Sequence, residues 1–194
     1  MNKPQLISHE FTEQHYVALG KMLVAFQSLE ATVTCGLLKL LQPGTLVPDS
    51  ALAAAVVGEL SFANRLKLLL IYPSLPGPKL APSEDKLAEV RQQVYAEAVD
   101  LLKQGGRIAA EAEEKRNQLV HSWWLSGCSI AGSPDGTVFR VKSRIKKNKV
   151  HVSNQFITAK DIEAVVEEMN TAESQLQKAV QHLNYLTVSA LPSE

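Results

Sequence analysis

The sequence has few of the features that mark a disulfide-stabilised, strongly charged or membrane-spanning protein. Two cysteines occur among 194 residues, so neither a disulfide framework nor a cysteine metal site is expected. Lys plus Arg and Asp plus Glu both number 20, which excludes a globally basic nucleic-acid binder. The apolar runs LLLIY and AAAVV are too short to span a bilayer, and the first fifteen residues contain no apolar signal core. We therefore predict a cytoplasmic protein with reduced thiols, no cofactor and no membrane partner.

Apolar residues at three- and four-residue spacing predict a mainly α-helical fold. Ser61 is in a position to cap the third predicted helix, and prolines between residues 73 and 82 predict a loop. Gly105 and Gly106 together indicate a break between two later helices. The predicted helices cover residues 10–41, 52–57, 62–72, 83–102 and 107–124, the last ending before Gly127.

The period changes from helical to alternating near residue 137. Apolar and basic residues alternate through TVFRVKSRIK, and Lys147-Asn148 is a plausible tight turn. This pattern predicts a β-hairpin at about 137–153. Thr158 then caps a final helix with Asp161 in its first turn. The sequence thus predicts a single domain over residues 1–194. Its fold class is all-α (mainly), a helical bundle with a small β-hairpin inserted before the C-terminal helix.

The stretch EKRNQLVHSWW places Arg116, Asn117 and His121 near the end of a predicted helix. Asn117 and His121 share a face because they are four residues apart. Arg116 points about 140° away from His121 on an ideal helix. Two copies of the helix around a twofold axis would bring Arg116 of one chain to His121 of the other.

These side chains suit the cleavage of RNA without a metal ion. His121 can take a proton from the ribose 2′-hydroxyl, and Arg116 can stabilise the charge that develops on phosphorus-bound oxygens. Asn117 can support either residue. The alternative is an ordinary helix end, since Arg and His interact favourably with the helix dipole there.

The string Arg-Asn-x-x-x-His, together with FQSLEATV and SFANRLKLLL earlier in the chain, resembles the HEPN domain family. The resemblance covers about residues 11–186. Over this range the chain is similar to bacterial HEPN proteins of abortive-infection and toxin–antitoxin systems. It implies a metal-independent endoribonuclease with Arg116 and His121 catalytic and Asn117 supporting. It also implies a homodimer, an RNA substrate and, in toxin–antitoxin members, a cognate antitoxin.

The same resemblance leaves an alternative open and shows one departure. Some HEPN proteins are catalytically silent modules that bind nucleotide, RNA or a partner protein. Members that are controlled by AMP transfer carry a Tyr two residues after the His, where this chain has Trp123. Control by modification of that tyrosine is therefore not expected here.

Further candidate residues lie outside this motif. Six cations could guide RNA or form a solvated hairpin face: Arg140, Lys142, Arg144, Lys146, Lys147 and Lys149. We expect the first four on one face. In the second alternative, the other face with Val141 and Ile145 packs on the bundle. Trp123 and Trp124 could stack on bases or anchor the core. Glu30, within an apolar stripe, could support Arg116 or His121, or lie at the edge of that stripe.

Overall fold

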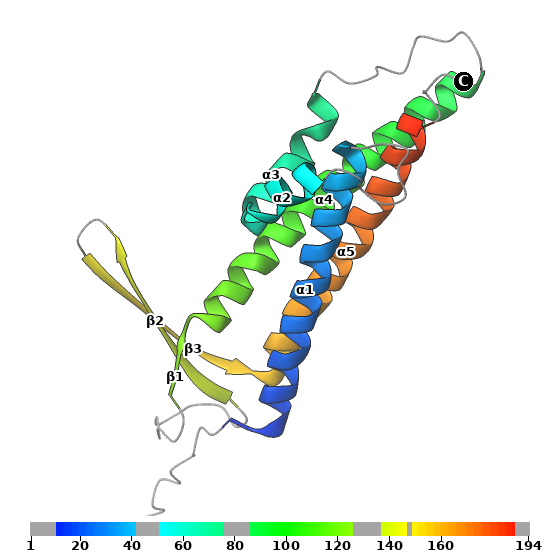
Figure 1. Cartoon of the computed structure of the whole chain (residues 1–194). Coiled ribbons are helices and arrows are strands. Elements are labelled where there is room, and N and C mark those ends of the chain that lie inside the picture. The colour runs from blue at the N-terminus through cyan, green and yellow to red at the C-terminus, as the bar shows by residue number, and fades with distance from the viewer. Residues whose placement is uncertain (1–10, 42–50, 76–85, 126–136, 147–148, 189–194) are drawn as a thin grey trace, which may run out of the picture. The chain divides into compact units, whose positions relative to one another are not determined.

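The structure is a computed structural model of the chain, and it describes residues 11–41, 51–75, 86–125, 137–146 and 149–188. It is mainly helical, with a small antiparallel sheet before the C-terminal helix, as predicted (Figure 1). The elements are α1 (Glu13–Leu41), α2 (Ala51–Gly58), α3 (Phe62–Ile71), a 3₁₀ turn (Tyr72–Ser74), α4 (Lys86–Val120), β1 (Trp123–Leu125), β2 (Thr137–Lys146), β3 (Lys149–Thr158) and α5 (Ala159–Val188).

Two predicted helix caps are confirmed. The Ser61 hydroxyl accepts a hydrogen bond from the backbone N–H of Asn64 at 3.3 Å, which satisfies a donor in the first turn of α3. Thr158 and Asp161 form a reciprocal pair at the start of α5. The Thr158 N–H donates to Asp161 Oδ2 at 2.7 Å, and the Asp161 N–H donates to Thr158 Oγ1 at 3.1 Å.

The predicted break at Gly105-Gly106 is wrong, because α4 runs without interruption through both glycines. Both are buried. A Cβ atom on Gly106 would lie 2.4 Å from Leu70 Cδ2, and one on Gly105 would lie 3.1 Å from Leu176 Cγ. The glycines therefore allow α3 and α5 to approach α4 closely, which offsets their poor helix propensity.

Helix α4 also ends earlier than predicted, at Val120, because Trp123–Leu125 form a strand. The three strands are ordered β1-β2-β3, with both neighbouring pairs antiparallel. The hairpin of β2 and β3 is confirmed, but β1, which has only three residues, was not predicted. The predicted turn at Lys147-Asn148 and the predicted stop at Gly127 lie outside the described residues.

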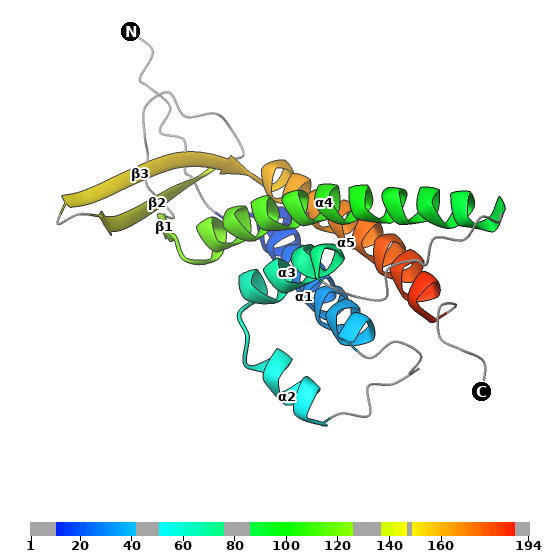
Figure 2. The same cartoon turned by 90° about the horizontal axis from the view of Figure 1, so that it is seen from above.

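The chain divides into two compact units, which are described separately. The first comprises residues 1–26 and 112–168, and the second comprises residues 27–111 and 169–194. The single domain expected over residues 1–194 stays a prediction. Within the second unit, segments of α1, α3, α4 and α5 lie side by side (Figure 2). A Cβ on Gly36 of α1 would lie 2.9 Å from Val180 Cγ2 of α5, so these helices also approach closely. Leu37, Leu38 and Val57 form a buried cluster.

The first unit holds the sheet, the start of α1, the end of α4 and the start of α5. Its buried apolar side chains include Met22, Phe26, Leu119, Val138, Ile157 and Ile162. Helix α1 is long and apolar enough to cross a membrane by length and composition, with 44% of the most apolar window buried. Core helices of water-soluble proteins meet the same criteria, so the cytoplasmic location stays a prediction.

Candidate functional site

The structure brings Arg116 and Asn117 together at the end of α4. Arg116 Nη1 donates a hydrogen bond to Asn117 Oδ1 at 2.9 Å. The guanidinium carbon lies 4.5 Å from the ring centroid of Phe26, a buried residue of α1, which is within the range of a cation–π interaction. Arg116 Nε is buried without a hydrogen-bond partner among the described residues. The ring and the amide together hold the guanidinium in one place.

His121 lies immediately after α4 and is exposed. Its backbone N–H donates to the Asn117 carbonyl oxygen at 3.2 Å, which continues the helical pattern by one residue. Among the residues that the structure describes, no hydrogen bond joins the His121 ring to Arg116 or Asn117. One chain therefore offers a fixed Arg116–Asn117 pair and a separate imidazole that is open to solvent.

The last carbonyl groups of α4 accept hydrogen bonds from side chains beyond the helix. Arg140 Nη1 donates to the Gln118 oxygen at 3.0 Å, Lys142 Nζ donates to the Asn117 oxygen at 3.3 Å, and Trp124 Nε1 donates to the Leu119 oxygen at 3.1 Å. A helix end has unpaired carbonyls and a partial negative charge, so two cations from β2 suit it. Helix α4 has no basic residue in its own last turn.

Arg140 is buried, with 4% of its surface exposed. Its Nη2 donates to Gln155 Oε1 at 2.9 Å and its Nη1 also reaches Ser122 Oγ at 3.3 Å. Burial lowers the pKa of the guanidinium from its usual range. Because the usual pKa of an arginine is so high, the side chain stays charged. A buried Arg140, whose two terminal nitrogens donate within the protein, is not available to RNA phosphates. Its predicted place on an RNA-guiding strip is therefore wrong.

The rest of the predicted cationic strip is only partly described. Lys142 is half-buried, and its ammonium group donates to the Asn117 carbonyl oxygen near the end of α4. It therefore also binds the end of this helix. The expected alternation along β2 is present, but the face of Arg140 and Lys142, not that of Val141, turns toward α4. The side chains of Arg144, Lys146, Lys147 and Lys149 lie outside the described residues.

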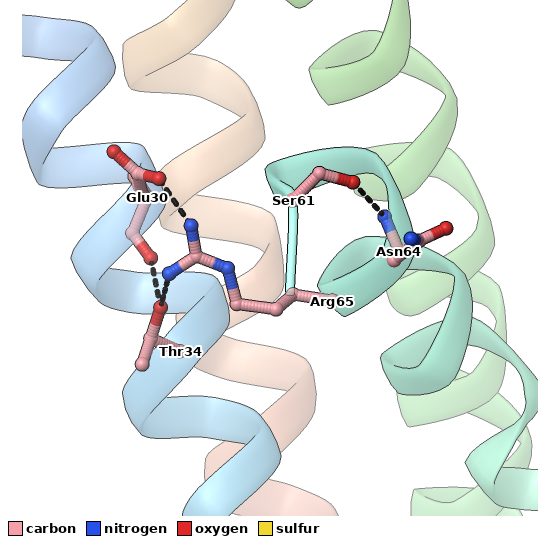
Figure 3. A network of polar contacts seen from close by, with 5 residues as sticks. All are labelled: Glu30, Thr34, Ser61, Asn64 and Arg65. Atoms are coloured by element: carbon pink, nitrogen blue, oxygen red, sulfur yellow. Dashed lines mark hydrogen bonds and ion pairs between the residues drawn. The ribbon is translucent and has the colours of Figure 1, made fainter. Parts of the chain in front are cut away.

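Glu30 has a different partner from those expected. Its carboxylate accepts a short hydrogen bond from Arg65 Nη2, and Arg65 Nη1 donates to Thr34 Oγ1 at 2.6 Å (Figure 3). Only 11% of the Arg65 side chain is exposed, so this ion pair fixes α3 against α1 within the second unit. The expected support of Arg116 or His121 by Glu30 stays a prediction, because Glu30 belongs to the second unit and the motif to the first.

The two tryptophans have different surroundings. Trp124 is half-buried, donates to the Leu119 oxygen, and meets the ring of Phe11 edge-on at 5.1 Å between centroids. Trp123 is 75% exposed. Trp124 is therefore the anchor that the sequence suggested as one alternative.

Sequence reasoning missed Phe26, Gln118, Ser122 and Gln155. Phe26 sits in the apolar stripe of α1 like any core residue, and no local signal shows that a guanidinium covers its ring. The other three act through a carbonyl, a hydroxyl and an amide, which depend on tertiary contacts.

Chemically, the arrangement offers a positioned guanidinium near the end of α4 and an exposed imidazole on the residue that follows the helix. Comparison of the chain with protein-family models, with curated proteins and with solved structures finds no match.

Proposed function

We propose that this protein is a HEPN-type, metal-independent endoribonuclease that acts as a homodimer, as a toxin or antiviral effector. The observation that carries the proposal is the pairing of a fixed Arg116–Asn117 group with an exposed His121. Imidazole exchanges protons near neutral pH, and guanidinium binds phosphate oxygens while it stays charged. Together these two groups can promote cleavage of RNA by its own 2′-hydroxyl.

The reaction uses His121 from each of two chains. One imidazole removes the proton from the ribose 2′-hydroxyl, and that oxygen attacks the adjacent phosphorus. Arg116 stabilises the added negative charge on the phosphate. The second imidazole, protonated, gives its proton to the departing 5′-oxygen. The products are a 2′,3′-cyclic phosphate and a 5′-hydroxyl end, with no net change in protons.

A second copy is part of the proposal because Arg116 and His121 diverge by about 140° around one helix. Two motifs around a twofold axis form a composite cleft in which Arg116 of one chain serves His121 of the other.

The test is cleavage of single-stranded RNA by the purified chain in excess EDTA, with analysis of product ends. His121→Ala should lower the rate by about a hundredfold to ten-thousandfold. Because His121 is exposed, its substitution should leave stability unchanged, so loss of activity would not reflect unfolding. The matched control is His151→Ala, which removes another exposed histidine and should retain cleavage. Equal cleavage by wild type and His121→Ala would overturn the proposal.

A second candidate function is a catalytically silent HEPN-like module that binds nucleotide, RNA or a partner protein. One observation favours it: Arg116 is already engaged by Asn117 and Phe26. In that case Arg116→Ala should destabilise the chain, and neither wild type nor His121→Ala should cut RNA under conditions in which both bind it.

A further inference from the structure

The two sides of the sheet have opposite character. One side carries Trp124, Arg140 and Gln155 in register, and its polar atoms are bound to each other and to the end of α4. The other side, here called the aromatic face, carries the residues that alternate with these. Its central members are Trp123, Leu125, Phe139, Val141, Ser143, Val152, Asn154 and Phe156.

The aromatic face is open to solvent at several points. Trp123 is 75% exposed and Val152 is 64% exposed. Phe139 and Phe156 are a cross-strand pair with ring centroids 5.2 Å apart, and both are half-buried. Trp123, Leu125, Val141 and Ser143 line a shallow hollow on this face. Three aromatic rings thus share one side of an open antiparallel sheet.

The side chains that line the hollow indicate its ligand. An exposed indole ring and two aliphatic side chains suit a flat ring that packs face to face. The Ser143 hydroxyl can hydrogen-bond with a polar edge of that ring. None of the described residues that line the hollow is charged, so this lining does not favour a phosphate group. A nucleobase, flat and neutral with donors and acceptors on its edge, fits these requirements.

The position of Trp123 relates the hollow to the candidate catalytic residue. Trp123 follows His121 by two residues, so their Cα atoms are at most about 7 Å apart. Exposed aromatics on an open sheet are a known means of stacking unpaired bases of single-stranded nucleic acid. Double-stranded RNA keeps its bases stacked inside the helix and cannot use such a surface.

We propose that Trp123 and the hollow beside it form a stacking site for one unpaired nucleobase of single-stranded RNA, next to the phosphate on which His121 acts. This inference rests on the proposed ribonuclease function for the role of the site. The binding that it predicts does not require cleavage. Stacking tolerates any base, so the site gives preference for single strands over duplexes more than for a particular sequence.

The test uses the full chain with His121→Ala, so that RNA stays intact, and a labelled single-stranded RNA of about eight nucleotides. Adding Trp123→Ala should weaken binding by about fivefold to 150-fold, the loss expected for one stacked base. Trp123→Phe should restore most of the affinity, because a smaller ring still stacks. Tyr185→Ala, at an aromatic that is 70% exposed in the second unit, is the matched control and should bind like the parent.

Intrinsic fluorescence gives a second readout, since the chain has two tryptophans. Single-stranded RNA should quench the signal of Trp123, and Trp123→Phe should remove that quenching while Trp124 remains. A duplex of the same sequence should quench little. Equal affinity of the Trp123→Ala variant and its parent would overturn the inference. So would a change from dimer to monomer in Trp123→Ala without a change in RNA affinity per chain, which would identify the aromatic face as a protein interface.

The outcomes separate this inference from the ribonuclease proposal. Binding that depends on Trp123, with no cleavage by the wild-type chain, supports the stacking site and contradicts the enzyme. Cleavage that depends on His121, with affinity independent of Trp123, does the reverse.

Discussion

The middle and the end of helix α4 are held by different kinds of contact. In the middle, Gly105 and Gly106 leave no room for a side chain because Leu70 and Leu176 lie against the helix backbone. At the end, the carbonyl groups accept hydrogen bonds from Arg140, Lys142 and Trp124. The middle should therefore be sensitive to added atoms, and the end to lost donors.

The largest effect is expected from filling the middle of α4. Gly106→Leu places carbon atoms where Leu70 already lies, and overpacking should outweigh the gain of about 1 kcal/mol in helix propensity. We expect the free energy of unfolding to fall by about 3 kcal/mol, measured by urea denaturation. Gly20→Leu is the control, because nothing lies within 4 Å of a Cβ there. If both variants had the same stability, close packing would not explain the buried glycine.

Removing a donor from the end of α4 should have the next largest effect. Arg140→Met keeps much of the side-chain volume but removes the charged hydrogen bonds to Gln118 and Gln155, so unfolding should become easier by about 2 kcal/mol. Arg140→Lys should recover only part of the loss. Lysine keeps the positive charge, but its ammonium group cannot bind Gln118 and Gln155 at the same time as the guanidinium does. Arg107→Met removes an exposed ion pair with Glu111 and should change stability by less than about 0.5 kcal/mol. If the Arg140 and Arg107 substitutions changed stability equally, the hydrogen bonds of Arg140 to the end of α4 would not contribute to stability.

The contrast between these regions also shows what a sequence reveals. The helices, the hairpin and the caps at Ser61 and Thr158 were predictable because apolar spacing and capping residues act over a few neighbours. Gly105-Gly106 was misread as a break because its role depends on Leu70, which is distant in the sequence. Strand β1 has three residues, too few for an alternating pattern.

The candidate site was also predictable only where its residues are close together in the sequence. The spacing of Arg116, Asn117 and His121 is local, and the structure indeed joins the first two. Alternation placed Arg140 and Lys142 on one face of β2, but it could not tell which face packs on α4. Phe26 under Arg116 and Arg65 beside Glu30 come from other helices, so no local pattern reveals them.

Glu30 provides a smaller effect that separates stability from activity. Glu30→Ala removes the carboxylate partner of the largely buried Arg65, and unfolding should become easier by about 1.5 kcal/mol. RNA cleavage per folded chain should stay at the wild-type level if the role of Glu30 is the ion pair with Arg65. Denaturation and cleavage measured on the same samples test both statements. Loss of cleavage with unchanged stability would instead support the predicted role of Glu30 beside Arg116 or His121.

The smallest effect is expected at a third region of α4, where Glu97 accepts a hydrogen bond from Lys178 of α5 at 2.8 Å. That bond and the charge of Lys178 hold the pKa of Glu97 below its ordinary value of 4.5. A lowered folded-state pKa contributes stability above the ordinary value, and the contribution is lost as pH falls through the folded-state pKa. Both side chains are about half exposed, so solvent and salt screen the pair.

Glu97→Gln should therefore be slightly less stable than wild type at pH 7, close to the error of a thermal melt. The difference should vanish in acid, where the wild-type carboxylate is protonated, and should shrink in high salt at neutral pH. Melts from pH 7 to pH 3 with both proteins test this. A difference that grew toward low pH would mean that Glu97 is stabilised in its neutral form, and α4 would then be held at this point by a buried hydrogen bond instead of an exposed ion pair.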